Sequence, residues 1–264
     1  MLHAPTVATA TSARATARRP FWLFEVLLLA AFYVAYAWIR DEHGRDVRGS
    51  HQQRVAFAHA RDLLSTEGHL HLDPEHFFQT LLPRDGFPVH LVNGFYLLAH
   101  VTVTVAVLVF LLWRRPALYR RCRNALLVIS TVSLALFALY PTAPPRLLPA
   151  AHIHDTLVAG GWWSLNHGGI ERIADPYAAM PSLHLGWSTW VALSLAASFA
   201  PTWRRWLFAL YPLAVTWVVL ATGAHWFLDT AAGAALALVG WAAAGRVTRS
   251  GRHRFPIPRR GGTS

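Results

Sequence analysis

The sequence has no lysine, one cysteine and few charged residues. A single cysteine, Cys122, excludes an intrachain disulfide framework and a cysteine-based zinc site. Charged residues make up only 14% of the 264 residues, whereas hydrophobic residues make up 54%, and the mean hydropathy is +0.32. An ordinary soluble domain of this length is more polar. The composition therefore predicts a membrane protein that crosses the bilayer several times.

The apolar residues gather in segments long enough to cross a bilayer. A hydrocarbon core of about 30 Å requires roughly 20 apolar helical residues. Six segments reach or approach that length, so the sequence predicts an all-α, integral membrane bundle of six transmembrane helices. The predicted spans are Phe21–Ile39, Val89–Trp113, Asn124–Tyr140, Leu183–Ala200, Trp206–Gly223 and Trp226–Gly245.

The arginines predict the orientation of this bundle, because basic residues accumulate in cytoplasmic connections. Sixteen of the 24 lie before the first span, between the second and third, between the fourth and fifth, or after the sixth. We therefore expect the protein to lie in the plasma membrane with both termini in the cytoplasm. We interpret the net charge of +11 as a consequence of this topology and not as a sign of nucleic-acid binding. The organisation predicted is a basic tail (1–20), a six-span domain (21–245) and a second basic tail (246–264).

The first apolar segment has an alternative interpretation as a cleavable signal peptide. Arginines precede it, and the small residues Ala35 and Ala37 resemble a cleavage site. Its apolar run is longer than that of a usual signal peptide, which favours a retained anchor.

Residues 41–88 are predicted to form amphipathic helices on the extracytoplasmic surface, because their apolar residues recur at helical intervals. The segment contains several potential metal ligands, but Asp73-Pro74-Glu75 is better explained as a helix start with Asp73 as the cap. Neither these residues nor the later histidine-rich segment predicts a metal site, and no cofactor is expected. The potential ligands considered are His69, His71, Asp73, Glu75 and His76, and then His152, His154 and Asp155.

Three polar clusters interrupt the apolar pattern, each where a predicted span meets the extracytoplasmic side. The first runs from Tyr140 to Arg146 and contains three prolines, which end the helix and leave an arginine able to bind phosphate. The second, Met180 to His184, begins a helix at Pro181-Ser182, and the free amides of a helix start favour an anion. We therefore expect Arg146 and Ser182 near a bound phosphate and His184 beside it.

The third cluster, Thr222 to Asp229, forms the turn between the last two spans. His225 and Asp229 are four residues apart, so on a helix their side chains share one face. An ionisable residue within a span is costly and indicates function. Asp229 could accept a hydrogen bond from one imidazole nitrogen of His225 and leave the other nitrogen as a nucleophile or base.

Together, the segments Tyr140–Arg146, Met180–His184 and His225–Asp229 resemble the type 2 phosphatidic acid phosphatase (PAP2) superfamily, over roughly residues 50 to 245. Within it, they are most similar to the branch of the inositol phosphorylceramide synthases. The resemblance implies that His225 attacks phosphorus and becomes a phosphohistidine, that Asp229 orients it, and that His184 protonates the leaving alcohol. It further implies that Arg146 and Ser182 hold the phosphoryl oxygens, without a metal ion.

The sequence departs from the superfamily at Val219, where many members have an arginine six residues before the nucleophilic histidine. This departure leaves both hydrolysis and head-group transfer open. We expect a membrane-embedded lipid phosphatase or phosphotransferase whose active site is extracytoplasmic and whose substrate is a phospholipid or a polyprenyl phosphate. The alternatives are an inositol-phosphate-type head-group transferase and a non-catalytic lipid-binding or transport protein that retains the fold.

Overall fold

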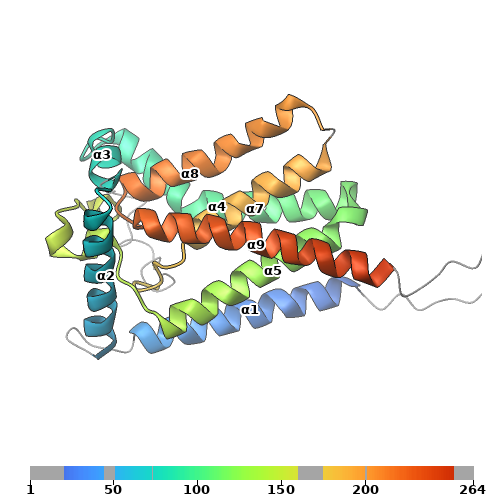
Figure 1. The fold of residues 1–264 in the computed structure, drawn as a ribbon, viewed down its shortest axis with the longest axis horizontal. Coiled ribbons are helices and arrows are strands. Elements are labelled where there is room, and N and C mark those ends of the chain that lie inside the picture. The colour runs from blue at the N-terminus through green and yellow to red at the C-terminus, as the bar shows by residue number, and fades with distance from the viewer. Residues whose placement is uncertain (1–20, 45–50, 73, 160–174, 200, 253–264) are drawn as a thin grey trace, which may run out of the picture.

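A computed structural model describes residues 21–44, 51–72, 74–159, 175–199 and 201–252, and over these residues the architecture is all-α. Long helices run side by side along the molecule, and α2 lies across one end of them (Figure 1). The elements are α1 (Phe21–Gly44), α2 (His51–His69), α3 (Pro74–Thr80), α4 (Phe87–Arg114), α5 (Pro116–Leu139), η1 (Pro145–Leu147), η2 (Pro149–Ala151), α6 (Thr156–Ala159), α7 (Leu183–Ser198), η5 (Trp203–Ala209), α8 (Leu210–Ala221) and α9 (Phe227–Arg252).

Four helical segments in the described part of the chain are long and apolar enough to cross a membrane. They are Phe87–Arg114, Pro116–Leu139, Trp203–Ala221 and Phe227–Arg246, and they correspond to the second, third, fifth and sixth predicted spans. In α1 the apolar helical stretch is Ala30–Ile39. Helix α7 has 16 residues and is therefore about 24 Å long. The protein is thus a membrane protein with at least four candidate spans, and the first and fourth spans remain predictions.

Two of the helices begin earlier than the predicted spans, at the ends that we expect to be cytoplasmic. Helix α5 begins at Pro116, eight residues before the predicted start at Asn124, so the arginine-rich segment that we expected to be a connection is mostly helical. Proline suits the first turn of a helix, and arginine is a good helix former. The predicted fifth span begins as the 3-10 helix η5, and α8 continues from it at Leu210.

The surface segment contains the two helices α2 and α3, in agreement with the helical periodicity of residues 41–88. Helix α3 begins at Pro74 with Glu75 in its first turn, as predicted. The expected cap, Asp73, lies outside the described residues. Side chains of α2 pack against the 143–153 segment and against Trp226, so α2 covers the end of the bundle where the polar clusters meet.

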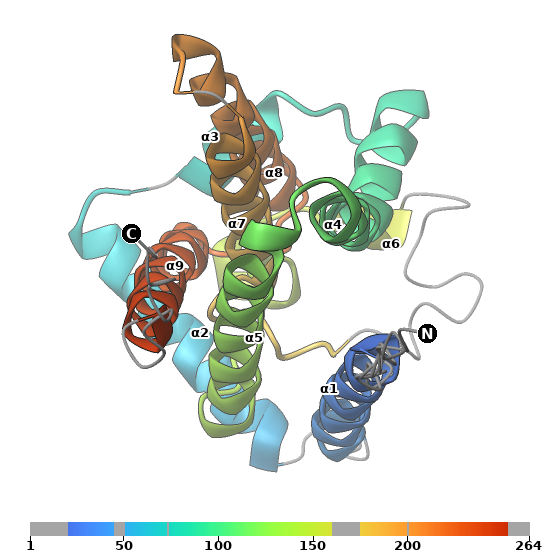
Figure 2. The same cartoon turned by 90° about the vertical axis from the view of Figure 1, so that its right-hand side faces the viewer.

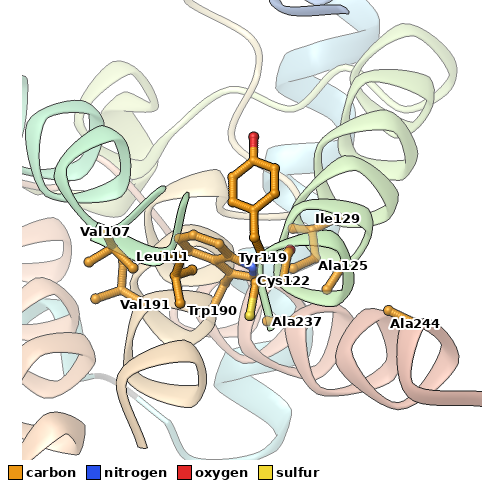
Figure 3. Close-up of a cluster of buried hydrophobic side chains, with 10 residues drawn as sticks. All are labelled: Val107, Leu111, Tyr119, Cys122, Ala125, Ile129, Trp190, Val191, Ala237 and Ala244. Carbon is orange, nitrogen blue, oxygen red and sulfur yellow. Dashed lines mark hydrogen bonds between the residues drawn. The ribbon is translucent and has the colours of Figure 1, made fainter. Parts of the chain in front are cut away.

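Helix α7 occupies the centre of the bundle, with α4, α5, α8 and α9 around it (Figure 2). The main apolar core forms between α4, α5, α7 and α9, and its largest member is Trp190 (Figure 3). The indole nitrogen of Trp190 donates a 2.7 Å hydrogen bond to the carbonyl of Cys122. This bond satisfies a polar group that would otherwise be costly in an apolar interior, and it fixes the central helix against α5.

Glycines let the helices around α7 approach closely. A Cβ added at Gly233 of α9 would overlap the carbonyl oxygen of Ser182 and lie 3.3 Å from the amide nitrogen of Gly186. A Cβ added at Gly240 would lie 3.1 Å from Cγ1 of Ile129 on α5. The regularly spaced small residues of the last span therefore allow α9 to pack closely against α7 and α5, as is usual for membrane helices.

Candidate active site

Backbone hydrogen bonds join the three polar clusters at the end of the bundle that α2 covers. The amide of Thr142 in the first cluster donates to the carbonyl of Tyr177, 2.8 Å away, just before the second cluster. The amide of Arg146 donates to the carbonyl of Gly223 in the third cluster, at 3.0 Å. The amide of Ser182 donates to the carbonyl of Asp229, also at 3.0 Å. These contacts bring together segments up to 77 residues apart.

A tight turn between α8 and α9 presents His225. Gly223 has a φ of +65°, a conformation that residues with a Cβ rarely adopt, and an added Cβ would collide with Ile153. His225 is 4% exposed. Its Nδ1 is 2.9 Å from the carbonyl oxygen of Ala179. Because a carbonyl can only accept, Nδ1 carries the proton, and Nε2 of a neutral ring has the free electron pair.

His184 lies opposite this nitrogen, in the first turn of α7. Its Nδ1 is 3.3 Å from Nε2 of His225, so Nδ1 of His184 is the donor of that pair. Its Nε2 is buried and has no partner among the described residues. Ser182 caps α7 by accepting a 3.4 Å hydrogen bond from the amide of Leu185, and Ser182 is fully buried. The sequence-predicted pair of histidines is therefore in direct contact.

Asp229 lies behind His225, fully buried in the first turn of α9. Its Oδ2 is 3.7 Å from Nδ1 of His225 and accepts a 3.0 Å hydrogen bond from the amide of Trp226. At this distance the predicted hydrogen bond from the imidazole to Asp229 is not formed, and the Ala179 carbonyl is the hydrogen-bond partner of Nδ1. At 3.7 Å, the carboxylate can still stabilise a positive charge on the ring electrostatically.

Arg146 reaches the same region from η1 but is engaged by an acidic residue. Its Nη1 lies 2.9 Å from Oδ2 of Asp155, while its Nε is buried without a partner among the described residues. The other oxygen of Asp155 accepts hydrogen bonds from the amides of Leu157 and Val158 at the start of α6. Asp155 therefore holds the guanidinium in place, and part of its donor fork remains available to a phosphate.

Aromatic rings from α4 surround His184. Tyr96 stacks on it, with ring centroids 4.5 Å apart, and the centroid of His100 is 4.1 Å away. A small hollow lies beside these rings between α4, α7 and α8. Its lining residues are Phe95, Tyr96, Ala99, His100, His184, Val215, Val218 and Val219. Val219, where many superfamily members have arginine, thus contributes an apolar wall.

Three features of the site were not predicted from the sequence. The Ala179 carbonyl gives no sequence signal, because every residue has one. Asp155 was considered only as a potential metal ligand, although within the described residues no cluster of three or more histidine, cysteine, aspartate or glutamate side chains could hold a metal ion. His100 could have been found, since an ionisable residue within an apolar span indicates function.

Comparison with known proteins places the chain in a family. The family model of the PAP2 superfamily matches residues 61–243, which include His184, His225, Asp229 and Arg146. No curated protein and no solved structure matches the chain. The match covers more than half of the sequence and extends from α2 to α9. The chain therefore belongs to the PAP2 superfamily.

Proposed function

We propose that this membrane protein of a phosphatase-type superfamily cleaves a lipid phosphoester through a phosphohistidine formed on His225. The observation that supports this most directly is the 3.3 Å contact between Nε2 of His225 and Nδ1 of His184. It pairs a nitrogen that bears a free electron pair with a proton donor. A nucleophile and an acid arranged in this way can act on the two sides of one phosphoryl group.

Substrate binding has to separate the two imidazole rings. A phosphorus atom in a reactive contact lies about 3–3.5 Å from its nucleophile, which is already the whole distance between Nε2 of His225 and Nδ1 of His184. The phosphoryl group therefore takes the place of the hydrogen bond between the rings. Arg146, held by Asp155, would bind its oxygens from the side.

In the first step, the electron pair on Nε2 of His225 forms the N–P bond while the P–O bond to the lipid alcohol breaks. The anionic phosphate favours the charged form of the His184 ring beside it. Doubly protonated His184 then gives its Nδ1 proton to the leaving oxygen and becomes neutral, keeping the proton on Nε2. His225 retains its Nδ1 proton, which the Ala179 carbonyl accepts, so its ring becomes positively charged. Asp229 stabilises that charge from 3.7 Å.

In the second step, neutral His184 takes a proton from an acceptor hydroxyl at Nδ1. The acceptor oxygen attacks phosphorus, the N–P bond breaks, and the electron pair returns to Nε2 of His225. Water as the acceptor gives a phosphatase, and an alcohol gives a phosphotransferase. The mechanism is otherwise the same.

The proposed substrate is a phospholipid or a polyprenyl phosphate in the extracytoplasmic leaflet. The site lies at one end of the apolar helices, where a phosphate at the membrane surface and a lipid tail within the bilayer can both be accommodated. The arginine distribution of the sequence supports the proposed orientation, and the plasma membrane is the proposed location.

The test is phosphate release by the purified protein in detergent from a panel of lipid phosphates, with EDTA present. We expect turnover by the parent protein, a ³²P-labelled adduct that is labile in acid and stable in base, and loss of both in His225→Ala. His69→Ala, which removes an exposed histidine of α2, is the matched control and should behave like the parent. Turnover without such an adduct, or an adduct of equal yield in His225→Ala, contradicts the proposal.

Head-group transfer is the second candidate, and the apolar wall at Val219 favours it. An arginine at this position would add a phosphate contact, whereas valine leaves the hollow beside His184 apolar. Transfer of a labelled phosphoryl or phosphoinositol group between added lipids, faster than release into water, would identify a transferase. The narrower resemblance to inositol phosphorylceramide synthases is part of this second candidate.

A further inference from the structure

Helices α2 and α3 each place a buried carboxyl group at the start of α9. Glu67 is near the end of α2 and is 2% exposed, and Glu75 is in the first turn of α3 and is 4% exposed. Buried glutamates are rare unless they are paired. Neither residue is part of the proposed chemistry, so their burial requires another explanation.

Both carboxyl groups bind backbone amides in the first turn of α9. The amide of Phe227 donates to Oε1 of Glu75 at 2.6 Å, and the amide of Leu228 donates to Oε1 of Glu67 at 2.8 Å. The first amides of any helix have no partner within the helix. Here two helices more than 150 residues away in sequence supply the partners.

The next amide towards the nucleophile is held in the same way. The amide of Trp226 donates to Oδ2 of Asp229 at 3.0 Å, and His225 directly precedes Trp226. Three consecutive amides after the proposed nucleophile are therefore each bound by a carboxyl oxygen. The position of the His225 ring depends on this short segment, because α9 is connected to α8 only through it.

The two glutamates also interact with each other. Their carboxyl groups accept from the adjacent amides of Phe227 and Leu228, and two buried carboxyl groups so close together favour keeping one proton between them. Burial, and next the charge of Glu75, raise the pKa of Glu67 to about 8. The charged groups that face Glu67 are Glu75 from α3 and Asp229 from α9, and its third contact is the uncharged amide of Leu228.

We propose that Glu67 and Glu75 form a proton-sharing clamp on the first turn of α9 that positions His225 for attack. The proposal rests on the proposed function, because it assigns His225 as the nucleophile. The glutamates are positioning residues, and neither takes part in the transfer of protons to or from the substrate.

The clamp makes the site sensitive to alkaline pH. With the shared proton in place, the pair carries a single negative charge, which suits the positive end of a helix. Loss of that proton leaves two adjacent carboxylates close to Asp229, and their repulsion pushes α2 and α3 away from α9. We therefore expect kcat to fall above about pH 8, by about tenfold per pH unit as for a single ionisation.

The test compares pH profiles of kcat in the parent, Glu67→Gln and Glu75→Gln. A glutamine can accept from the α9 amide with its oxygen and donate to the other carboxylate with its nitrogen, so each variant replaces the shared proton by a permanent N–H. We expect both variants to remain active and to lose the fall of kcat that begins near pH 8, whereas a fall that comes from loss of the His184 proton is common to all variants. Asp62→Asn, which neutralises an exposed carboxylate of α2, is the matched control and should keep the fall near pH 8. A fall near pH 8 that is unchanged in both glutamine variants overturns the proposal.

Hydrogen–deuterium exchange of the peptide containing residues 225–230 gives a readout that does not depend on activity. Corrected for the intrinsic pH dependence of exchange, protection should fall above about pH 8 in the parent and stay constant in the glutamine variants. If the parent turns over no lipid phosphate but shows this exchange pattern, the proposed function fails while the clamp stands. If exchange is the same in all variants at every pH, the clamp is overturned even if the enzyme is active.

Discussion

Gly233 offers a test of how precisely the two histidines have to be placed. It lies on α9, one turn beyond Asp229, against the first turn of α7, which bears His184. In Gly233→Ala, the new Cβ would overlap the Ser182 carbonyl oxygen and lie 3.1 Å from the carbonyl carbon. These are backbone atoms and cannot rotate away. Since carbon atoms pack at about 3.5–4.0 Å, the helices have to move apart by roughly 1 Å.

We expect that displacement to act on catalysis more than on stability. A shift of about 1 Å at the reacting groups can cost about a hundredfold in rate, whereas overpacking costs typically about 1–3 kcal/mol of stability. The assay is kcat for phosphate release or transfer at saturating lipid, beside thermal unfolding in the same detergent. Gly240→Ala is the control, because its Cβ meets the flexible side chain of Ile129. If Gly233→Ala and Gly240→Ala have equal kcat, close contact of α7 and α9 does not position the histidines.

Three further predictions follow from single contacts. The free energy of unfolding should fall as pH rises from about 4.5 to about 8, because the folded protein keeps on Glu67 a proton that the unfolded chain releases in this range. Chemical unfolding in detergent across that pH range measures this free energy, and Glu67→Gln should make it less dependent on pH. Arg146→Lys should raise KM for the lipid phosphate about tenfold with folding unchanged, since an ammonium group lacks the planar donor fork, and an unaltered KM would exclude Arg146 from phosphate binding. Asn93→Ala should lower stability by about 1–3 kcal/mol, since Nδ2 of this fully buried residue donates a 2.7 Å hydrogen bond to the Thr156 carbonyl; equal thermal unfolding of variant and parent would contradict it.

The helices and the polar clusters could be predicted from the sequence because both depend on local pattern. The apolar run of residues 89–113 and the Pro181-Ser182 start of α7 carry their own signals, and the structure places the corresponding helices at Phe87–Arg114 and Leu183–Ser198. The start of α5 was misplaced because an arginine-rich segment was interpreted only as a sign of topology. Arginine is also a good helix former, and the helix extends through that segment.

The supporting contacts of the site could not be predicted, because each depends on the packing of distant segments. The carbonyl of Ala179 has no distinctive chemistry in the sequence, and only the fold brings it within 2.9 Å of His225. Asp155 was considered only as a potential metal ligand, and its partner Arg146 was assigned to phosphate alone. Glu75 was explained as part of a helix start, a local interpretation that concealed its contact with α9. Local patterns thus predict elements and reactive residues, whereas the partners that orient them require the tertiary structure.

The short contact between the two histidines has a consequence for the resting protein. A nitrogen whose electron pair is occupied by a neighbour's proton is a poor ligand for stray transition metals and a slow target for electrophiles. With Nε2 of His225 only 3.3 Å from Nδ1 of His184, the histidine pair shields its own most reactive atom from chemical damage. Acylating reagents such as diethyl pyrocarbonate should therefore modify the exposed His69 well before His225, and only a phosphate that separates the rings exposes the nucleophile.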